Sequence, residues 1–260
     1  MANSFSKKKK IAVITGASSG IGREFAYELA KEGYNLVLIA RRLDRLEEIK
    51  KNVKTEAIII QADITKSSDI LNVLDIIKQM DISVFINNAG FGSSGAFINN
   101  NLQKEIEMIE VNVKAMHIFT KMIIRKMLKQ KHGYLLNVAS SAGLFPAGPY
   151  MSAYYATKSY AASLTLAIAE ELKKVNAPVY VGCLCPGPVN TEFNDVANVS
   201  FALKGISAKH CVKYTLAKMK KKKVLIVPTI QMKLAIFFSK FLPLEVLIRM
   251  VGRQQRKKMG

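Results

Sequence analysis

The chain has 260 residues, of which 50% are hydrophobic and 22% are charged. That composition supplies a sizeable core, and it excludes a disordered or collagen-like chain. Three cysteines without Cys-x-x-Cys spacing and three scattered histidines predict neither a disulfide framework nor a metal site. This cysteine usage favours a reduced, cytoplasmic protein.

Charge is the unusual bulk property, with 39 basic residues against 19 acidic ones and a formal net charge of +20. Such an excess favours nucleic acid, anionic lipid or an acidic substrate as a partner. However, only eight of the basic residues are arginine, and the lysines accompany many Ile and Asn, as a general lysine bias would produce. No recognition helix or aromatic stacking module accompanies the charge, so we predict no nucleic-acid partner. Basic residues cluster at 7–10, 220–223 and 253–258.

In chain order, short β-branched runs alternate with longer amphipathic segments. We expect strands at residues 11–15, 35–40, 57–61, 83–87, 134–139, 179–184 and 224–227, and helices near 20–32, 42–51, 66–80, 102–130, 152–175 and 207–219. Several runs are apolar at consecutive positions, which indicates strands buried on both faces of a parallel sheet. The alternation predicts an α/β fold of the doubly wound Rossmann type, with a seven-stranded parallel sheet and helices on both faces.

The domain organisation follows from the same pattern. A basic segment at 1–10 precedes a single domain over 11–228, and a basic amphipathic extension occupies 229–260. Apolar residues dominate the extension from 230 to 251 with Pro243 in the middle, so we expect two short helices. We interpret the extension as a cover for the core or a subunit interface, as a lid, or as a peripheral contact with an anionic membrane surface. No transmembrane helix is predicted, because the longest uncharged stretch, 133–157, contains many polar groups.

A glycine-rich segment follows the first expected strand. Glycines at 16, 20 and 22 allow a tight turn and a close approach to a diphosphate, whose charge then lies at the positive end of the next helix. The position between a strand and a helix, in the first βα unit, favours a dinucleotide site over an ordinary turn. The candidate phosphate-binding residues are Gly16, Ser18, Ser19, Gly20, Ile21 and Gly22.

The end of the second strand indicates which dinucleotide binds. An NAD-type site places a carboxylate there for the ribose 2′-hydroxyl, but this chain has Ala40 followed by Arg41 and Arg42. Two guanidinium groups without an acidic neighbour favour the 2′-phosphate of NADP; the alternative is that both arginines cap a solvated helix. Asp63 and residues 87–90 follow the third and fourth strands, so we expect them at the same ligand-binding edge.

A Tyr-x-x-x-Lys pair follows the fifth strand. Tyr154 and Lys158 are four residues apart and share one helix face, and Ser140 and Ser141 precede them by one loop. A phenol titrates near 10, so a useful acid–base group near pH 7 needs about 4 kcal/mol of stabilisation of its anion. One ammonium about 4 Å away supplies an energy of that order at an effective dielectric of about 20. Lys158 and the positive charge of an oxidised nicotinamide are therefore sufficient causes for a working Tyr154.

With these residues in order, residues 11 to about 228 resemble the short-chain dehydrogenase/reductase family. The resemblance implies that Tyr154 exchanges a proton with the substrate oxygen, that Lys158 lowers the tyrosine pKa and holds the nicotinamide ribose, and that a serine orients the carbonyl. It assigns Asn112 to a water that links the lysine to solvent. It also assigns Asp63 and Ile64 to the adenine, Asn88 to the cofactor ribose region and Thr191 to the carboxamide. The remaining expected cofactor contacts are Gly90, Tyr154, Lys158, Pro186, Gly187 and Val189.

The catalytic serine is ambiguous. Strand register from Gly133 and Asn137 selects Ser140, whereas counting back from Tyr154 selects Ser141. Since strand register is stiffer than loop length, we choose Ser140.

The leading hypothesis is an NADPH-dependent oxidoreductase that interconverts a ketone or aldehyde and an alcohol. Its substrate pocket is expected in 190–205, where Phe193, Val196, Val199, Phe201 and Leu203 favour a hydrophobic or lipid-like substrate, such as a 3-oxoacyl or steroid-like ketone. A non-catalytic NADPH-binding regulator is the alternative. The resemblance also implies a homo-oligomer, a dimer or a tetramer.

Overall fold

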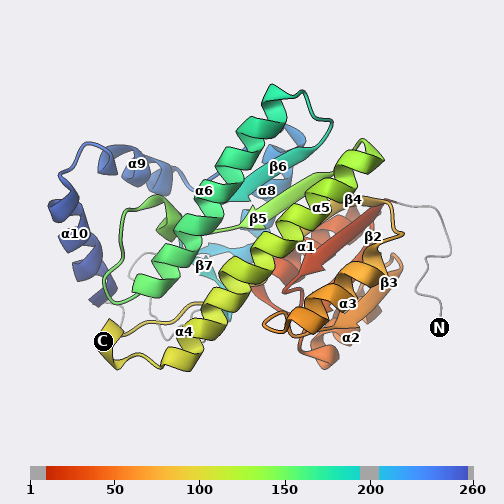
Figure 1. Ribbon diagram of the computed structural model, residues 1–260, viewed down its shortest axis with the longest axis horizontal. Coiled ribbons are helices and arrows are strands. Elements are labelled where there is room, and N and C mark those ends of the chain that lie inside the picture. Colours follow the sequence, from red (N-terminus) through yellow and green to blue (C-terminus); the bar gives the residue numbers. More distant parts are fainter. Residues whose placement is uncertain (1–9, 194–204, 257–260) are drawn as a thin grey trace.

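A parallel sheet forms the centre of the computed structural model, which describes residues 10–193 and 205–256 (Figure 1). The seven strands lie in the order β3-β2-β1-β4-β5-β6-β9. Their bounds are β1 Ile11–Thr15, β2 Asn35–Ala40, β3 Ala57–Gln61, β4 Ile82–Asn87, β5 Tyr134–Val138, β6 Tyr180–Leu184 and β9 Leu225–Ile226. All neighbouring pairs are parallel. The Rossmann-type prediction is confirmed.

Helices cover both faces of the sheet. They are α1 Gly20–Lys31, α2 Leu43–Asn52, α3 Ser67–Ile77, α4 Leu102–Ile109, α5 Met116–Gln130, α6 Ser152–Lys174, α8 Ala208–Lys220, α9 Ile230–Ser239 and α10 Leu244–Arg256. Two short helical turns, Phe97–Asn99 and Ser141–Leu144, lie in the connections. The α1, α2 and α8 helices pack in one cluster, and α3, α5 and α6 pack in the other.

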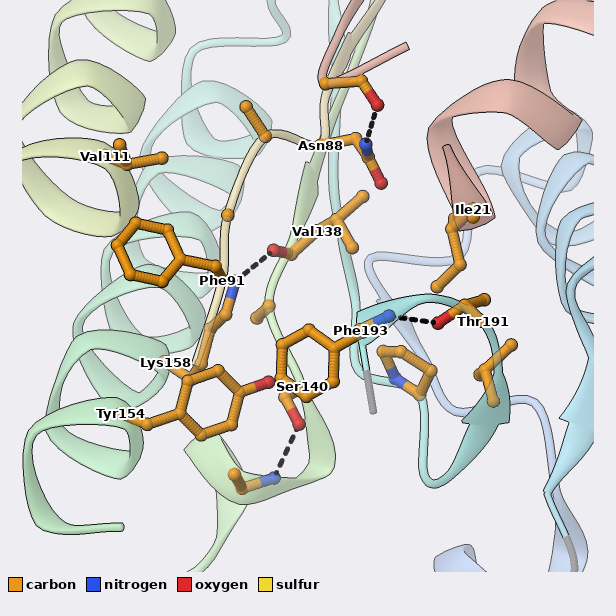
Figure 2. A pocket seen from close by; sticks show the side chains of 18 of the residues that line it. Ile21, Asn88, Phe91, Val111, Val138, Ser140, Tyr154, Lys158, Thr191 and Phe193 are labelled. Atoms are coloured by element: carbon orange, nitrogen blue, oxygen red, sulfur yellow. Dashed lines mark hydrogen bonds between the residues drawn. The ribbon is translucent and has the colours of Figure 1, made fainter. Parts of the chain in front are cut away.

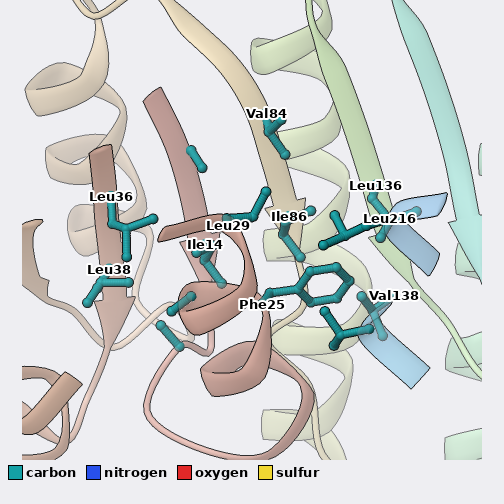
Figure 3. Packing of buried hydrophobic residues seen from close by; sticks show 14 of the residues in the cluster. Ile14, Phe25, Leu29, Leu36, Leu38, Val84, Ile86, Leu136, Val138 and Leu216 are labelled. Carbon is teal, nitrogen blue, oxygen red and sulfur yellow. The ribbon is translucent and has the colours of Figure 1, made fainter. Parts of the chain in front are cut away.

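Strand β1 shows why consecutive apolar residues are needed. Ala12 and Ile14 belong to the cluster of α1, where Phe25 and Leu29 are fully buried (Figure 3), whereas Val13 belongs to the opposite cluster. Successive side chains of a strand point to opposite faces, so a strand covered on both sides favours apolar residues at consecutive positions. Three predicted strands have the observed bounds, and the other four differ by no more than one residue at either end.

Two features of the connections were not predicted. The expected helix at 102–130 is divided by a π-helical turn over Glu110–Ala115, which separates α4 from α5. In addition, β7 Val189–Asn190 and β8 Ile206–Ser207 form a separate two-stranded pair beside the main sheet. Both strands have two residues, too few for a periodicity to be recognised.

The C-terminal extension forms the two expected helices, α9 and α10, on either side of Pro243 (blue in Figure 1). Met232 and Ile236 of α9 pack against one small cluster, and Leu247 and Val251 of α10 belong to another that contains Tyr154. Among the residues that the structure describes, no helix has both the length and the apolar character needed to cross a bilayer. Residues 1–9, 194–204 and 257–260, which include Lys7, Val196, Val199, Phe201, Leu203 and Lys258 named above, lie outside the described residues.

Candidate active site

A cavity of about 510 Å³ lies at the carboxyl edge of the sheet and gathers the predicted site residues (Figure 2). Its volume is in the range of small-molecule and cofactor sites. The predicted residues that line it are Gly16, Ser18, Ser19, Gly20, Ile21, Arg41, Arg42, Asp63, Ile64, Asn88, Gly90, Ser140, Ser141, Tyr154, Lys158, Pro186, Gly187, Val189 and Thr191. Gly22 and Asn112 are not part of the lining; both lie directly behind it.

The residue that follows β4 fixes the position of the glycine-rich loop. The Asn88 side-chain amide donates to the carbonyls of Thr15 at 3.0 Å and Gly16 at 3.2 Å. Gly16 has φ +64, where a side chain is strained, and a Cβ there would lie 2.8 Å from Ala89. At Gly22 a Cβ would overlap the Gly16 carbonyl and the Asn88 amide. The loop is thus built to bring bare backbone and the N-terminus of α1 to the cavity, as a diphosphate requires.

Arg42 lies beside the glycine-rich loop, where β2 meets α2. Its Nε and Nη2 lie 3.4 and 3.3 Å from the Ser18 hydroxyl, to which they donate. Its Nη1 donates to the Glu192 carboxylate at 2.9 Å. The Gln61 side-chain amide donates to the Arg41 backbone carbonyl at 3.0 Å, and Arg41 is exposed and lines the cavity. Arg42 is the N-cap residue of α2 but makes no capping hydrogen bond with its side chain, and its guanidinium contacts Ser18 of the glycine-rich loop instead.

The other predicted cofactor contacts come from the loops that follow β3, β6 and β7. Asp63 accepts hydrogen bonds from the backbone and hydroxyl of Thr65 at 3.1 and 2.9 Å, so one carboxylate oxygen is already used within its own turn. Thr191 lies against Gly20, where a Cβ would be 3.2 Å from the threonine Cβ. Pro186 accepts a hydrogen bond from the Ser141 backbone at 2.8 Å, which joins the β6 loop to the β5 loop.

Ser140 and Tyr154 meet at one end of the cavity. Ser140 follows β5 and Tyr154 lies in the first turn of α6, and Figure 2 shows the two side chains next to each other in the cavity. The Ser140 hydroxyl also accepts from the backbone of Ala142 at 3.1 Å. Burial raises the pKa of Tyr154 to about 12, and the Ser140 hydrogen bond opposes that rise. Both Ser140 and Ser141 line the cavity, and the choice of Ser140 as the catalytic serine stays a prediction.

Lys158 is buried beside this pair. Its ammonium donates to the Val138 carbonyl at 3.0 Å and lies 5.9 Å from the centroid of the Tyr154 ring. Burial lowers the pKa of Lys158 to about 8. The expectation that Lys158 and an oxidised nicotinamide together make the phenol of Tyr154 acidic stays a prediction. The tyrosine hydroxyl is removed from water, and this cost to the anion outweighs the attraction of the lysine.

Asn112 lies in the π-helical turn and behind Gly90. Its amide donates to the carbonyl of Phe91 at 2.9 Å and to the Thr157 hydroxyl at 3.1 Å, and its carbonyl accepts from the Phe91 backbone at 3.2 Å. A Cβ on Gly90 would lie 2.8 Å from the Asn112 oxygen and 3.1 Å from the Lys158 ammonium. The extra residue of a π-helical turn re-aims one side chain, and such turns are frequent at functional sites.

Several residues of the site carried no recognisable sequence signal. Phe91 is one of them and lines the cavity. Phe193, by contrast, was predicted for the substrate pocket, and its ring lies against that of Tyr154 with centroids 5.5 Å apart. Four further lining residues come from the C-terminal helices: Met232, Ala235, Gln254 and Gln255. Gln255 donates to the Tyr155 hydroxyl at 2.6 Å. The interpretation of the extension as a cover over the site is thus the one that the contacts support.

These features define a class of protein. A doubly wound parallel sheet, a glycine-rich loop at the N-terminus of α1 and a buried Ser-Tyr-Lys group in one cavity are the parts of a nucleotide-binding oxidoreductase. A family model described as short chain dehydrogenase matches residues 10–200. The chain belongs to the short-chain dehydrogenase/reductase family.

Curated and solved relatives agree with this assignment. The chain is 39% identical over 195 residues to an uncharacterized oxidoreductase of Staphylococcus saprophyticus, with 72% of this chain and 77% of that protein covered. It is 33% identical over 201 residues to 17-beta-hydroxysteroid dehydrogenase type 3 of Homo sapiens, with 74% and 63% covered. A short-chain dehydrogenase from Sphingobium yanoikuyae, solved in complex with NADPH, superposes with a TM-score of 0.79 at 27% identity, with 85% and 88% covered.

Proposed function

We propose that this oxidoreductase uses NADP(H) to interconvert a hydrophobic ketone or aldehyde and the corresponding alcohol. The observation that carries the proposal is the shared cavity: the Ser140–Tyr154 hydroxyl pair and the buried Lys158 lie at one end, and the glycine-rich loop and Arg42 at the other. Gly16 and Gly20 would hold the diphosphate region, Asn88 would lie at the cofactor ribose region, and Pro186 to Thr191 would hold the nicotinamide end. The close packing at Gly16 and Gly22 fits such a group, because it leaves backbone alone facing the cavity.

Each side chain then has a definite task in the reduction of a carbonyl. The Ser140 hydroxyl donates to the carbonyl oxygen and orients it, and the Tyr154 hydroxyl delivers the proton that the oxygen needs as it becomes an alcohol. Lys158 supplies a positive charge that stabilises the tyrosine anion left behind. When bound, the nicotinamide supplies or accepts the hydride, and its oxidised form adds a second positive charge to the site.

The electrostatic requirement explains why both charges are needed. To bring a pKa of about 12 to about 7 requires about 7 kcal/mol, at 1.36 kcal/mol per unit. One unit charge at 5.9 Å, the distance from the Lys158 ammonium to the centroid of the Tyr154 ring, supplies about 3 kcal/mol at an effective dielectric of about 20. We therefore propose that Lys158 and the positive charge of an oxidised nicotinamide stabilise the tyrosine anion together.

The preference for NADP(H) rests on the end of β2. Ala40 is followed by two arginines and no carboxylate, and the Arg42 guanidinium lies against the glycine-rich loop. A guanidinium matches the forked geometry of a phosphate. The similar Sphingobium structure contains NADPH, which supports the same preference. We expect Arg42→Ala to weaken NADPH binding by about tenfold or more and to leave NADH within about twofold, because each charge-assisted bond is worth roughly 1.5–3 kcal/mol.

The substrate class is proposed from the walls of the cavity. Phe91, Phe145, Met151, Phe193 and Met232 surround the hydroxyl end with apolar surface. The human relative named above is a hydroxysteroid dehydrogenase, which supports a bulky lipid-like ketone.

The decisive experiment follows the loss of NADPH absorbance with a panel of aliphatic, steroid-like and 3-oxoacyl carbonyl compounds. We expect turnover with at least one hydrophobic member and a loss of about 10³-fold or more in Tyr154→Phe. Tyr160→Phe is the matched control, since Tyr160 is on the same helix and bonds His117 outside the cavity. NADPH binding with no turnover of any compound, and no difference between the two variants, would favour the non-catalytic regulator instead.

We also propose a peripheral membrane contact through α9 and the start of α10. The exposed apolar residues of this face are Ile230, Leu234, Phe237 and Phe238 of α9, Phe241 of the following turn and Leu244 at the start of α10, all at least half exposed or nearly so. Met232 and Ile236, on the opposite side of α9, pack on the core, so this helix is apolar on both faces and one face lacks a cover in the described structure.

Charge selects an anionic lipid surface as the cover. Residues 230–256 carry five basic side chains and one acidic one. Two copies of this face would bring like charges together, whereas anionic headgroups would pair with them. Because Met232 and Ala235 of α9 line the cavity, a bilayer held there would deliver a lipid-like ketone close to the site. The homo-oligomer and the cytoplasmic location remain predictions.

Vesicle flotation tests the contact. We expect the full chain to bind vesicles that contain anionic phosphatidylglycerol more than neutral vesicles, and Phe241→Gln, at a residue 71% exposed, to weaken binding by about fivefold or more. Phe97→Gln is the control, because Phe97 is 63% exposed but lies far along the chain from α9. Equal binding of both variants would exclude α9 as the anchor, and a loss of self-association in Phe241→Gln would identify the face as an interface between copies.

A further inference from the structure

Glu192 occupies an unusual place in the site. It follows Thr191, which lies against the glycine-rich loop, and precedes Phe193, which stacks on Tyr154. Its carboxylate accepts a hydrogen bond from Arg42 Nη1 at 2.9 Å, although the two residues are 150 positions apart. Both line the cavity. A carboxylate from the loop after β6 thus reaches across to the arginine at the end of β2.

The surroundings of Glu192 are strongly basic. Its pKa is lowered mainly by the hydrogen bond from Arg42, and the charges of Arg23 and Arg45 act in the same direction. The Glu192 carboxylate is therefore ionised at neutral pH, and its negative charge offsets part of the positive potential around Arg42. No sequence motif indicated the contact, because it depends on the path of the loop after Pro188.

We propose that Glu192 is a specificity-determining residue that competes with the coenzyme 2′-phosphate for Arg42. A carboxylate and a phosphate bind the same guanidinium N–H groups, so both cannot hold Nη1 at once. NADPH must displace Glu192 before Arg42 contacts its 2′-phosphate. NADH has a 2′-hydroxyl instead, so its binding does not require the Glu192–Arg42 hydrogen bond to break. Glu192 therefore lowers the ratio by which the chain prefers NADPH over NADH. This inference rests on the proposed role of Arg42 in NADP(H) binding.

The size of the effect follows from exposure. The side chains of Arg42 and Glu192 are 44% and 38% exposed, so the pair is partly screened by solvent. Exposed ion pairs correspond to changes of about two- to fivefold in an equilibrium constant. We expect Glu192→Gln to tighten NADPH binding by about that factor and to change NADH binding by less than twofold. The gain should shrink in about 0.5 M salt, because exposed charges are screened there.

The test measures dissociation constants by the fluorescence of bound NADPH and NADH, with no substrate present. Glu48→Gln is the matched control: it removes the same charge from a neighbouring position, where Glu48 pairs with Arg45 at 3.8 Å and does not line the cavity. We expect Glu48→Gln to change the two constants equally and by less than twofold. Urea unfolding of each variant shows whether the fold is intact.

The outcomes separate this inference from the proposed function. Unchanged or weaker NADPH binding in Glu192→Gln, or equal tightening of both coenzymes, would overturn the competition. The double variant Arg42→Ala/Glu192→Gln should show none of the gain, because the contested group is absent. If Arg42→Ala alone leaves NADPH binding unchanged, the proposed NADP(H) preference is wrong; if it weakens NADPH but Glu192→Gln has no effect, only the competition is wrong.

Discussion

Lys158 offers the sharpest link between the site and the stability of the fold. Its pKa of about 8 in the folded chain, against 10.5 in the unfolded chain, means that burial disfavours the charged form. The difference corresponds to about 3 kcal/mol at 1.36 kcal/mol per unit. This cost is fully present below about pH 8, where the folded chain must hold an ammonium, and it disappears as the pH rises past 10.5.

Replacement of Lys158 by Met removes that cost and retains most of the side-chain volume. It also removes the hydrogen bond to the Val138 carbonyl, a loss of about 1 kcal/mol. We therefore expect Lys158→Met to raise the free energy of unfolding of the cofactor-free chain by about 2 kcal/mol at pH 7. Near pH 10.5 the benefit should have largely vanished, while the lost hydrogen bond remains.

Urea unfolding at the two pH values, followed by far-ultraviolet circular dichroism, measures the difference. Lys173→Met is the control, since Lys173 is exposed near the end of the same helix and should change stability by less than about 0.5 kcal/mol. A Lys158→Met chain that is less stable than the wild type at pH 7 would refute the reasoning. So would a stability difference that does not depend on pH.

Two further substitutions test the construction of the site. Ser140→Ala should lower kcat/KM by about 10²-fold and Ser141→Ala by less than threefold, because the hydroxyl of Ser140 bonds Tyr154; a larger loss at Ser141 in the same assay would reverse the assignment. Gly22→Ala should lower the free energy of unfolding by about 2–3 kcal/mol, because the added methyl group overlaps Gly16 and Asn88. Gly33→Ala has open space around it but φ +85, and should lower the free energy of unfolding by about 1 kcal/mol. Equal shifts in urea midpoint for the two variants would contradict this difference.

The sheet and the cofactor end of the site were predictable because they depend on local signals. Apolar runs such as Ile11–Thr15 can satisfy two covered faces only as central strands. The glycines at 16 and 22 report close backbone contacts directly, since any side chain there meets another part of the chain. The order of strands then brings the predicted residues to one edge without further information.

Other parts of the site depend on long-range packing and left no local signal. The contact of Glu192 with Arg42 and the contribution of Gln255 to the cavity arise from where distant segments meet. The π-helical turn that carries Asn112 lies within an uninterrupted helical pattern. The raised pKa of Tyr154 was not predictable from sequence either, because a spacing of four residues on one helix face does not show how far burial removes the phenol from water.

The most direct test of the account is a tyrosinate titration of the chain with and without NADP⁺. Ultraviolet difference spectra between wild type and Tyr154→Phe isolate this one phenol from the other tyrosines. We expect no ionisation of Tyr154 below about pH 11 in the cofactor-free chain, because its pKa is raised to about 12. With saturating NADP⁺ its ionisation should appear several units lower, near neutral to mildly alkaline pH. An ionisation that stays above pH 11 with the cofactor bound would contradict the assignment of Tyr154 as the proton donor.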